Sequence, residues 1–394
     1  MFYIIYNKMV MKFIKDFNFE NKLVLLRADL NSDVKGENII LSQRIIEASK
    51  TINELKKKKA RVVIIAHQGN PKKDDFLSLR QHAKFLNKFT KVKFIEDIIG
   101  KKAINEINKL RSGDVILLEN IRFINDEFFP EKKDNKLLKI LAPLFDFYIN
   151  DAFSVSHRNQ TSIVGFPRIL PSCAGLLFEK EIKALEKISM KNCLYILGGA
   201  KPESNIKLLK GNKVLSCGLF GQMCLVANGK NLGYQNKFLE KATLNKGNYQ
   251  DFLLKLKKKL KNVLTPMDFA VNFNGKRKEF LLSEFPNDYE IEDIGEETIK
   301  KYVYEIKKAK AIYMKGPAGF SQDEKFSKGT VELLKAISKS KAFTLVGGGH
   351  LSDTIEKYKL PIKKFSHVSL SGGALLNYIA GEKLPGLEAI GYYK

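Results

Sequence analysis

The chain has 394 residues, 44% of them hydrophobic, and a formal net charge of +25 at pH 7. This length exceeds what one hydrophobic core usually supports, so two domains are expected. No apolar run approaches the roughly 18 residues that span a membrane, and the apolar opening, residues 1–6, is too short and lacks the basic lead of a signal peptide. We therefore expect a cytoplasmic protein with no membrane partner.

Lysine supplies most of the positive charge and is dispersed in runs such as Lys56–Lys59 and Lys255–Lys261. These runs indicate solvated helix faces, and neither a zinc-finger spacing nor an aromatic-glycine RNA signature is present, so nucleic acid is an unlikely partner. The four cysteines show no paired spacing of the kind that binds metal. They are expected to be reduced and structural.

Apolar, strand-like runs alternate with amphipathic helical stretches, which is typical of a parallel sheet covered by helices. In such sheets ligands bind beyond the carboxyl ends of the strands. Four runs in the first half each lead into polar side chains. They are Leu23–Leu26 before Asp29 and Asn31, Arg61–Ala66 before His67, Val115–Leu118 before Arg122, and Phe145–Ile149 before Arg158.

This edge suits a small polyanion, because arginine forks match phosphate and carboxylate geometry. Arg44, near the start of a helical stretch, is placed to reach the same edge. Any one of these groups can equally cap a helix or pair with a nearby acid. It is much less expected that polar groups at all four strand ends serve only as such caps or pairs.

The second half repeats the pattern with glycines after the strands. The expected strands are Leu194–Leu197, Lys213–Ser216, Val263–Leu264, Ala311–Met314, Phe343–Val346 and Val368–Ser369. Backbone amides after such strands can cradle a polyphosphate, and Lys201 would add a point charge. Taken alone, a stretch such as Gly-Gly-Ala-Lys at 198–201 is more often a tight turn with a solvated lysine. Neither a P-loop nor a dinucleotide fingerprint is present.

The sequence therefore predicts an α/β fold with two doubly wound, Rossmann-like parallel-sheet domains joined by a helix that starts near Cys173. One half offers an arginine-rich anion site and the other offers glycine loops with a lysine. This combination suggests phosphoryl transfer between two bound molecules, which depends on in-line positioning and charge stabilisation. Hinge closure would keep water away from the reactive phosphate.

From about Leu23 to its end, the chain resembles phosphoglycerate kinase. The segments that carry the resemblance are Arg27–Asn31, Ala66–Gly69, Leu117–Phe123, Asn150–Phe153 with His157 and Arg158, Leu197–Lys201, Gly316–Gly319, Val346–Gly349, Ser366–Ser369 and Leu384–Ala389. Nine segments in the family's order are highly specific. The Ala-His-Gln-Gly and Gly-Gly-Gly-His forms resemble the archaeal branch.

The resemblance implies reversible transfer of a phosphoryl group between 1,3-bisphosphoglycerate and ADP, giving 3-phosphoglycerate and ATP, a step of glycolysis and gluconeogenesis. Mg²⁺ would be carried by the nucleotide, with no metal site formed by the protein. The implied catalytic residues are Arg44, Lys201, Gly372 and Gly373. The implied substrate-binding residues are Asp29, Asn31, Arg44, His67, Asn70, Arg122 and Arg158. The implied nucleotide-binding residues are Lys201, Gly316, Gln322, Gly347, Gly348, Gly349 and His350.

The expected domains are a phosphoglycerate-binding domain at 1–171, an interdomain helix at 172–188 and a nucleotide-binding domain at 189–379. By the resemblance, the tail 380–394 packs back on the first domain, and the protein is a monomer or a homodimer.

Several positions depart from the family pattern. Asn70 replaces an arginine, Asn205 a second lysine, Lys315 an asparagine, Gln322 a glutamate, His350 an aspartate and Ser371 a glycine. These departures, together with the charge, keep an alternative open: a catalytically weakened relative whose basic surface binds nucleic acid or another polyanion. Against it stands the retention of Arg44, Arg122, Arg158 and Lys201.

Overall fold

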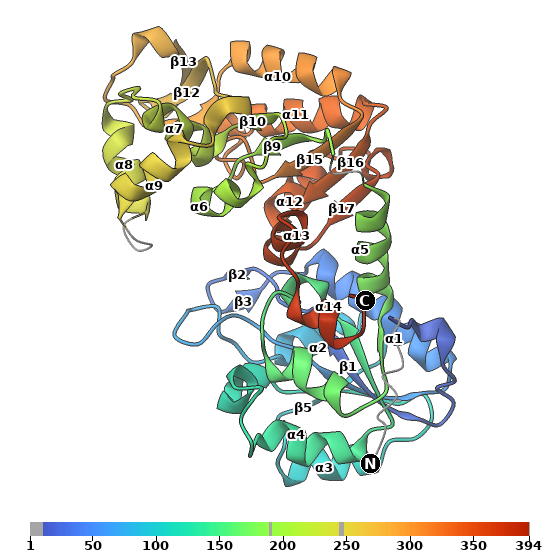
Figure 1. Cartoon of the computed structure of the whole chain (residues 1–394). Helices are drawn as coiled ribbons and strands as arrows, with labels where there is room; N and C mark the ends of the chain where they lie inside the picture. The colour runs from blue at the N-terminus through green and yellow to red at the C-terminus, as the bar shows by residue number, and fades with distance from the viewer. Residues whose placement is uncertain (1–10, 189–190, 244–247, 394) are drawn as a thin grey trace, which may run out of the picture. The chain divides into compact units, whose positions relative to one another are not determined.

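The computed structural model describes residues 11–188, 191–243 and 248–393, and the apolar opening at 1–6 lies outside them. The chain divides into two compact units (Figure 1). One holds the described residues up to Lys183 together with those from Gly381 onward, and the other is Ala184–Ala380. The boundary therefore falls inside helix α5 (Leu176–Lys187).

Within the described residues, the first unit is built on a six-stranded parallel sheet of order β5-β6-β4-β1-β7-β8. Its strands are β1 (Leu23–Ala28), β4 (Arg61–Ile65), β5 (Lys93–Ile95), β6 (Val115–Leu118), β7 (Phe147–Asp151) and β8 (Ser172–Ala174), with a hairpin of β2 (Val34–Lys35) and β3 (Asn38–Ile39). Its helices include α1 (Gln43–Lys57), α2 (Arg80–Leu86), α3 (Lys101–Asn108), α4 (Lys136–Leu141) and α14 (Pro385–Ala389).

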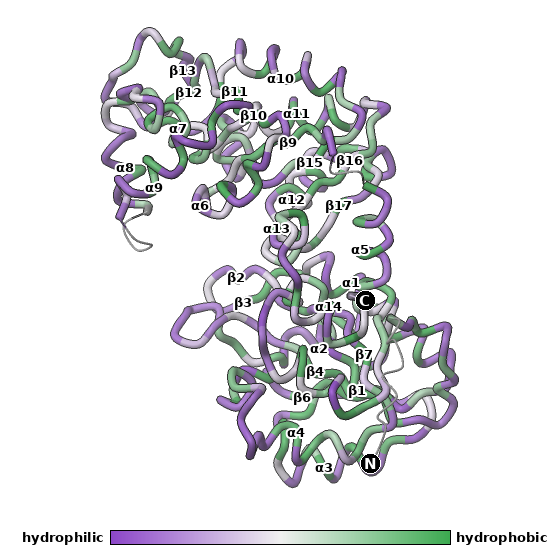
Figure 2. Tube along the Cα trace, in the orientation of Figure 1, coloured by the Kyte–Doolittle hydropathy of each residue, from purple (hydrophilic) through white to green (hydrophobic). Residues whose placement is uncertain are grey.

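Both faces of this sheet are buried, as helices on each side of a parallel sheet require. Val24 and Leu26 belong to one hydrophobic cluster, whereas Leu25 belongs to the cluster on the opposite face. Successive strand side chains point to opposite faces, so one apolar strand serves both cores. Figure 2 shows the hydrophobic colour concentrated along these strands.

The second unit repeats the design with a parallel sheet, six-stranded in the described residues, of order β11-β10-β9-β15-β16-β17. Its strands are β9 (Leu194–Leu197), β10 (Val214–Ser216), β11 (Val263–Leu264), β15 (Ala311–Lys315), β16 (Phe343–Gly347) and β17 (His367–Ser369). Its helices include α6 (Pro202–Asn205), α7 (Gly218–Ala227), α8 (Tyr234–Thr243), α9 (Tyr249–Lys257), α10 (Glu296–Lys308), α11 (Lys328–Lys339), α12 (Gly349–Lys357) and α13 (Gly373–Ile379). Two parallel α/β sheets confirm the predicted fold class.

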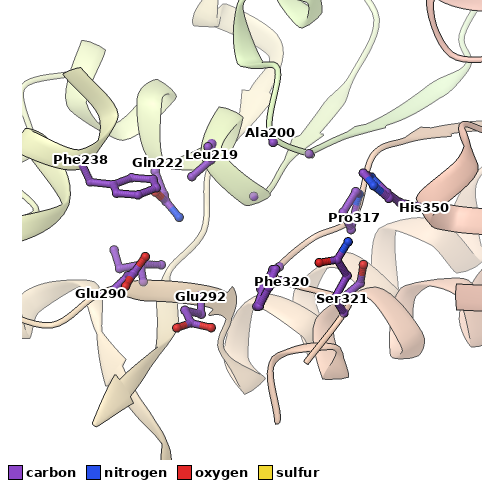
Figure 3. A pocket seen from close by; sticks show the side chains of 15 residues that line it. Ala200, Leu219, Gln222, Phe238, Glu290, Glu292, Pro317, Phe320, Ser321 and His350 are labelled. Atoms are coloured by element: carbon purple, nitrogen blue, oxygen red, sulfur yellow. The ribbon is translucent and has the colours of Figure 1, made fainter. Parts of the chain in front are cut away.

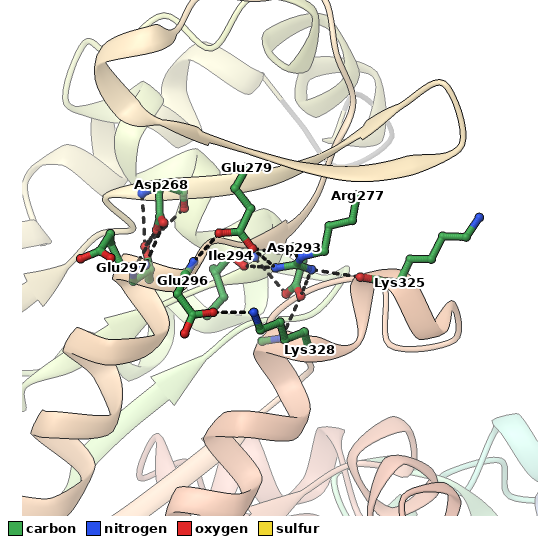
Figure 4. A network of polar contacts seen from close by, with 11 residues as sticks. Asp268, Arg277, Glu279, Asp293, Ile294, Glu296, Glu297, Lys325 and Lys328 are labelled. Carbon is green, nitrogen blue, oxygen red and sulfur yellow. Dashed lines mark hydrogen bonds and ion pairs between the residues drawn. The ribbon is translucent and has the colours of Figure 1, made fainter.

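A small antiparallel sheet of β12 (Asp268–Phe273), β13 (Lys276–Leu281) and β14 (Ile291–Ile294) is attached to this unit by a network of charged groups (Figure 4). Arg277 Nη1 donates to Asp293 Oδ2 at 2.8 Å, and the same oxygen accepts the Gly329 N–H at 2.8 Å. Lys328 of α11 pairs with Glu296 of α10. These contacts fix β14 against α11 and so hold the residues just before Asp293 in place.

The start of the interdomain helix differs from the prediction of a helix over 172–188. Ser172–Ala174 form β8, which pairs in parallel with β7, and α5 begins at Leu176. These residues form the edge strand of the sheet instead of the first turn of the helix, because Tyr148 pairs with Ser172 and Asn150 with Ala174. The helix period therefore starts later than the apolar pattern suggested.

Helix α14 packs on the first unit near its sheet edge. The Gly386 N–H donates to Ser156 O at 2.8 Å, and Ala389 packs against a cluster that contains Ala152 and Val155. Among the described residues, no helix combines the length and apolar character that crossing a membrane requires.

Asp151 caps the start of α5. Its Oδ1 accepts the N–H groups of Leu177 at 2.8 Å and Phe178 at 3.2 Å. Burial raises the pKa of Asp151 to about 7, although these N–H groups favour the charged form. A raised folded-state pKa means that this carboxyl contributes stability below its unfolded pKa of about 4 and loses that contribution as the pH rises to about 7.

We predict that Asp151→Asn, which keeps the accepting oxygen, flattens this pH dependence. Relative to wild type, the variant gains stability from pH ~4 to pH ~7, by at most about 1.4 kcal/mol per pH unit. Urea unfolding at several pH values measures it. The matched control is Asp74→Asn, at an exposed position, and parallel curves for wild type and Asp151→Asn would contradict the prediction.

Candidate active site

Arginines and one histidine gather beyond the carboxyl ends of the strands in the first unit. The pKa of His67 is held well below its usual value, first by burial and then by the charges of Arg27, Arg122, Arg158 and Arg44. The chain reverses its direction of strand addition between β1 and β7, which is the position where doubly wound sheets bind ligands. The side chains of Arg44, Arg122 and Arg158, which were predicted to converge with His67, thus lie close enough for their charges to lower its pKa.

Arg27 was not among the predicted site residues, yet it sets the protonation of His67. Its side chain is fully buried, and Nη2 lies 3.0 Å from His67 Nδ1. A guanidinium only donates, so Nδ1 accepts and the hydrogen of the neutral ring is on Nε2. His67 therefore presents one N–H donor without adding a positive charge to the cluster.

A buried carboxyl group holds Arg27 through a serine. Arg27 Nε donates to Ser162 Oγ at 2.9 Å, and Ser162 Oγ donates to Glu127 Oε1 at 2.7 Å. The Ser162 N–H also donates to Glu127 Oε2 at 2.8 Å. Burial raises the pKa of Glu127, and the charge of Arg27 opposes that rise. Neither Ser162 nor Glu127 follows a strand directly, so the strand-end rule missed them.

Asn70 links two arginines of the cluster. Its Oδ1 accepts from Arg122 Nη1 at 2.9 Å and from Arg158 Nη1 at 3.4 Å. Arg122 is buried, and burial followed by the charge of Arg158 lowers its pKa to about 9. Asn70, at the position where the resemblance implied an arginine, thus orients two guanidinium groups.

Asp29 and Asn31, which follow β1, make contacts inside the protein. Asp29 Oδ2 lies 3.5 Å from Arg44 Nε, and Arg44 Nη1 donates to Asn31 O at 2.9 Å. Asn31 Oδ1 accepts the Gly69 N–H at 2.8 Å. Gly69 has a φ of +67°, and a Cβ there would lie 2.1 Å from Asp75 O, so only glycine fits this loop. Asn31 therefore positions the loop that carries Asn70.

The second unit contains a cavity of about 440 Å³ beyond the ends of its strands (Figure 3). Leu219, Phe238, Pro317 and Phe320 give it apolar walls, as a pocket for a flat, apolar-faced group requires. The lining residues are Gly199, Ala200, Gly218, Leu219, Gln222, Phe238, Glu290–Glu292, Pro317, Gly319–Gln322 and His350.

At one wall of this cavity, hydrogen bonds fix which atoms of two glutamine amides donate and which accept. The Ile291 N–H donates to Gln235 Oε1 at 3.1 Å, and Gln235 Nε2 donates to Gln222 Oε1 at 2.8 Å. A backbone N–H can only donate, so it sets the orientation of both amides. Gln222 is left with Nε2 as a donor at the cavity wall (Figure 3). Gln222, Phe238 and Glu290 lie on helices or before a strand, which is why strand ends did not reveal them.

The predicted nucleotide-binding residues divide into three groups. Gln322 and His350 line the cavity. Lys201 and Gly316 are sequence neighbours of the lining residues Ala200 and Pro317. The remaining glycines are not among the lining residues: Gly347 ends β16, Gly348 is the N-cap of α12 and Gly349 is its first residue. The predicted catalytic glycines also lie outside the lining: Gly372 is the N-cap of α13 and Gly373 is its first residue.

Comparison with known proteins gives one consistent family. A family model described as phosphoglycerate kinase matches residues 14–382. The phosphoglycerate kinases of Methanothermus fervidus and Pyrococcus abyssi are 40% and 39% identical to this chain, covering 95% of it and 95% and 96% of their own lengths. The crystal structure of phosphoglycerate kinase from Pyrococcus horikoshii matches with a TM-score of 0.88 at 38% identity, covering 97% of this chain and 99% of that one. The structure of phosphoglycerate kinase from Coxiella burnetii matches with a TM-score of 0.75 at 30% identity, covering 96% and 98%.

We predict that His67 stays neutral, with its hydrogen on Nε2, from pH ~8 to pH ~5, because protonation would add a buried charge beside four arginines. Nitrogen-15 NMR of the imidazole rings distinguishes the tautomers. His82, whose pKa burial lowers to about 3, should also stay neutral. Uptake of a second proton by His67 near pH ~6.5, the ordinary value, would contradict the geometry.

Proposed function

Because this chain belongs to the phosphoglycerate kinase family and is a phosphotransferase, we propose that it transfers a phosphoryl group reversibly between 1,3-bisphosphoglycerate and ADP. The products are 3-phosphoglycerate and ATP, a step of glycolysis and gluconeogenesis. The observation that carries the proposal is the pairing of an arginine cluster in one unit with an apolar-walled cavity beside Lys201 in the other.

The glycerate is proposed to bind in the first unit. Arg122 and Arg158, oriented by Asn70, would hold its anionic groups, and His67 Nε2–H would donate a further hydrogen bond. Arg44 is proposed to neutralise charge on the transferring phosphoryl. Arg44 is partly buried, and charge-assisted contacts are stronger where water is largely excluded.

The nucleotide is proposed to bind in the second unit, with its base in the cavity and its phosphates toward Lys201. The glycine-rich starts of α12 and α13, with Gly347–Gly349, Gly372 and Gly373, would present backbone N–H groups to the phosphates. Gln322, a lining residue, would bind the ribose through its amide.

Mg²⁺ is proposed to arrive with the nucleotide. Two carboxylates, Glu290 and Glu292, line the cavity, but within the described residues no group of three or more His, Cys, Asp or Glu side chains could hold a metal ion, so the phosphates would be the main ligands of the ion. When bound, the ion supplies neutralisation of phosphate charge. Lys201 and the backbone amides would orient the phosphates around it.

We further propose that the two units close during turnover, so that water is excluded from the reactive phosphoryl group. The boundary between the units falls inside α5, a continuous helix, which supports a hinge of limited flexibility. The proposal holds for a monomer or a homodimer. A cytoplasmic location is proposed because all four cysteines are free and buried, which suits a reducing compartment.

A coupled assay with 3-phosphoglycerate, ATP and Mg²⁺ tests the reaction directly, and absence of turnover by folded wild-type protein would refute it. The alternative, motivated by the +25 charge, is a weakened relative that binds a polyanion through its basic surface. Salt-dependent binding to DNA or RNA at physiological ionic strength, together with no kinase activity, would favour that alternative.

We predict that Lys201→Ala lowers kcat roughly a hundredfold while the affinity for 3-phosphoglycerate changes little, because the lost charge acts mainly on the transition state. Steady-state kinetics and calorimetry of glycerate binding measure the two effects. The matched control is Lys207→Ala, an exposed lysine of the same segment, which should keep wild-type rates. Equal losses of turnover and glycerate affinity in Lys201→Ala would exclude this role.

A further inference from the structure

Lys315, the last residue of β15, holds an ammonium group that nothing in the proposed mechanism uses. Its Nζ donates to Asn205 Oδ1 at 2.7 Å and to Ser204 Oγ at 3.0 Å. Both acceptors are neutral. Within the described residues, no ion pair is formed by this Nζ, and the side chain is partly buried.

Placing a cation among neutral oxygens is costly, and such groups are usually paired or bound to a ligand. Burial, followed by the charge of Lys201, lowers the pKa of Lys315 to about 8, while the charge of Glu203 raises it. Two of the three ammonium hydrogens are used by Ser204 and Asn205, so one donor remains. The group is therefore short of negative charge and has a hydrogen bond to give.

Asn205 is built as a holder for this ammonium. It is fully buried, and its Nδ2 donates to Gly198 O at 3.1 Å. That contact turns Oδ1 toward Lys315. The Gly198 N–H in turn donates to Lys315 O at 2.8 Å, so the end of β9 and the end of β15 are joined by backbone and by side chain.

The location is the one at which a doubly wound sheet binds its ligand. Strands β10 and β11 lie on one side of β9, and the later strands β15, β16 and β17 lie on the other side. The reversal between β9 and β15 is the switch point. Lys201 follows one of these strands and Lys315 ends the other, beside the cavity-lining residues Gly199 and Pro317.

We propose that Lys315 binds the phosphate chain of the nucleotide as a second cation beside Lys201, positioned by Asn205. This inference rests on the proposed function and deepens it. Positions 205 and 315 are both departures from the family pattern, and the structure shows that these two departures contact each other. Position 205 carries an asparagine where the resemblance implied a lysine. The ammonium group of Lys315, at the end of the neighbouring strand, contacts this asparagine.

The test removes the charge and keeps the hydrogen bond. Lys315→Gln retains an N–H donor for Asn205, so a merely structural role would leave activity unchanged. The expected result is a fall of roughly ten- to a hundredfold in kcat/KM for MgATP, with KM for 3-phosphoglycerate within about twofold of wild type. The matched control is Lys310→Gln, an exposed lysine just before the opposite end of β15, which should behave as wild type.

An exchange variant provides the second measurement. Asn205→Lys with Lys315→Asn interchanges the two contacting side chains and returns one ammonium to the same place. It is expected to recover most of the activity that Lys315→Gln loses. Wild-type kinetics for Lys315→Gln, or a folded exchange variant as slow as Lys315→Gln, would overturn the proposal.

Titration with ADP separates this inference from the proposed function. ADP should bind Lys315→Gln roughly tenfold or more weakly than wild type, whether or not the wild type turns over. As the pH rises through about 8, wild-type affinity should fall more than that of Lys315→Gln, with Lys201 and Glu203 as the other charged groups that act on Lys315. Equal affinities in both proteins at every pH would contradict a phosphate contact.

Discussion

Burial of arginine charge without a matching carboxylate is the constraint on which the first unit depends. Arg27 and Arg122 are almost completely buried, and within the described residues neither lies at ion-pair distance from an acid. Neutral oxygens, such as Ser162 Oγ and Gly69 O, orient their N–H groups without cancelling the charge. The rest of the fold must supply the free energy that this arrangement costs, and an anionic ligand would offset that cost.

The second unit uses a related solution with less charge and more backbone. The loops after β9 and β15 approach so closely that a Cβ on Gly316, whose φ is +73°, would lie 2.6 Å from Gly198 O. Glycine is therefore required for the two strand ends to meet. That meeting places Asn205 against Lys315, where an amide oxygen orients a cation. In both units, then, neutral oxygens orient positively charged groups.

The sequence predicted what depends on strand ends and missed what depends on tertiary contacts. Alternating apolar runs identified the α/β class and most strands, because a buried parallel strand is apolar on both faces. Arg27 directly follows the predicted strand Leu23–Leu26, but it was missed because its role depends on a contact with His67 that only the fold brings about. Gln222 and Phe238 were missed because they reach the cavity from helices. At Asn70 the sequence indicated only the replacement of an arginine, since the contact of Asn70 with both Arg122 and Arg158 depends on how the fold brings these residues together.

The neutral state of His67 follows from the same constraint and explains why a histidine stands among arginines. A fifth positive group would add to the repulsion that already lowers the pKa of Arg122 and Arg158, after burial. A neutral imidazole whose Nδ1 accepts from Arg27 supplies a directed N–H without that penalty. It also needs no proton uptake when an anion binds, so its hydrogen bond is available over the pH range in which the arginines stay charged. The buried acid Glu127 is linked to His67 through the hydrogen bonds of Ser162 and Arg27, and its charge opposes the lowering of the pKa of Arg122 and Arg158.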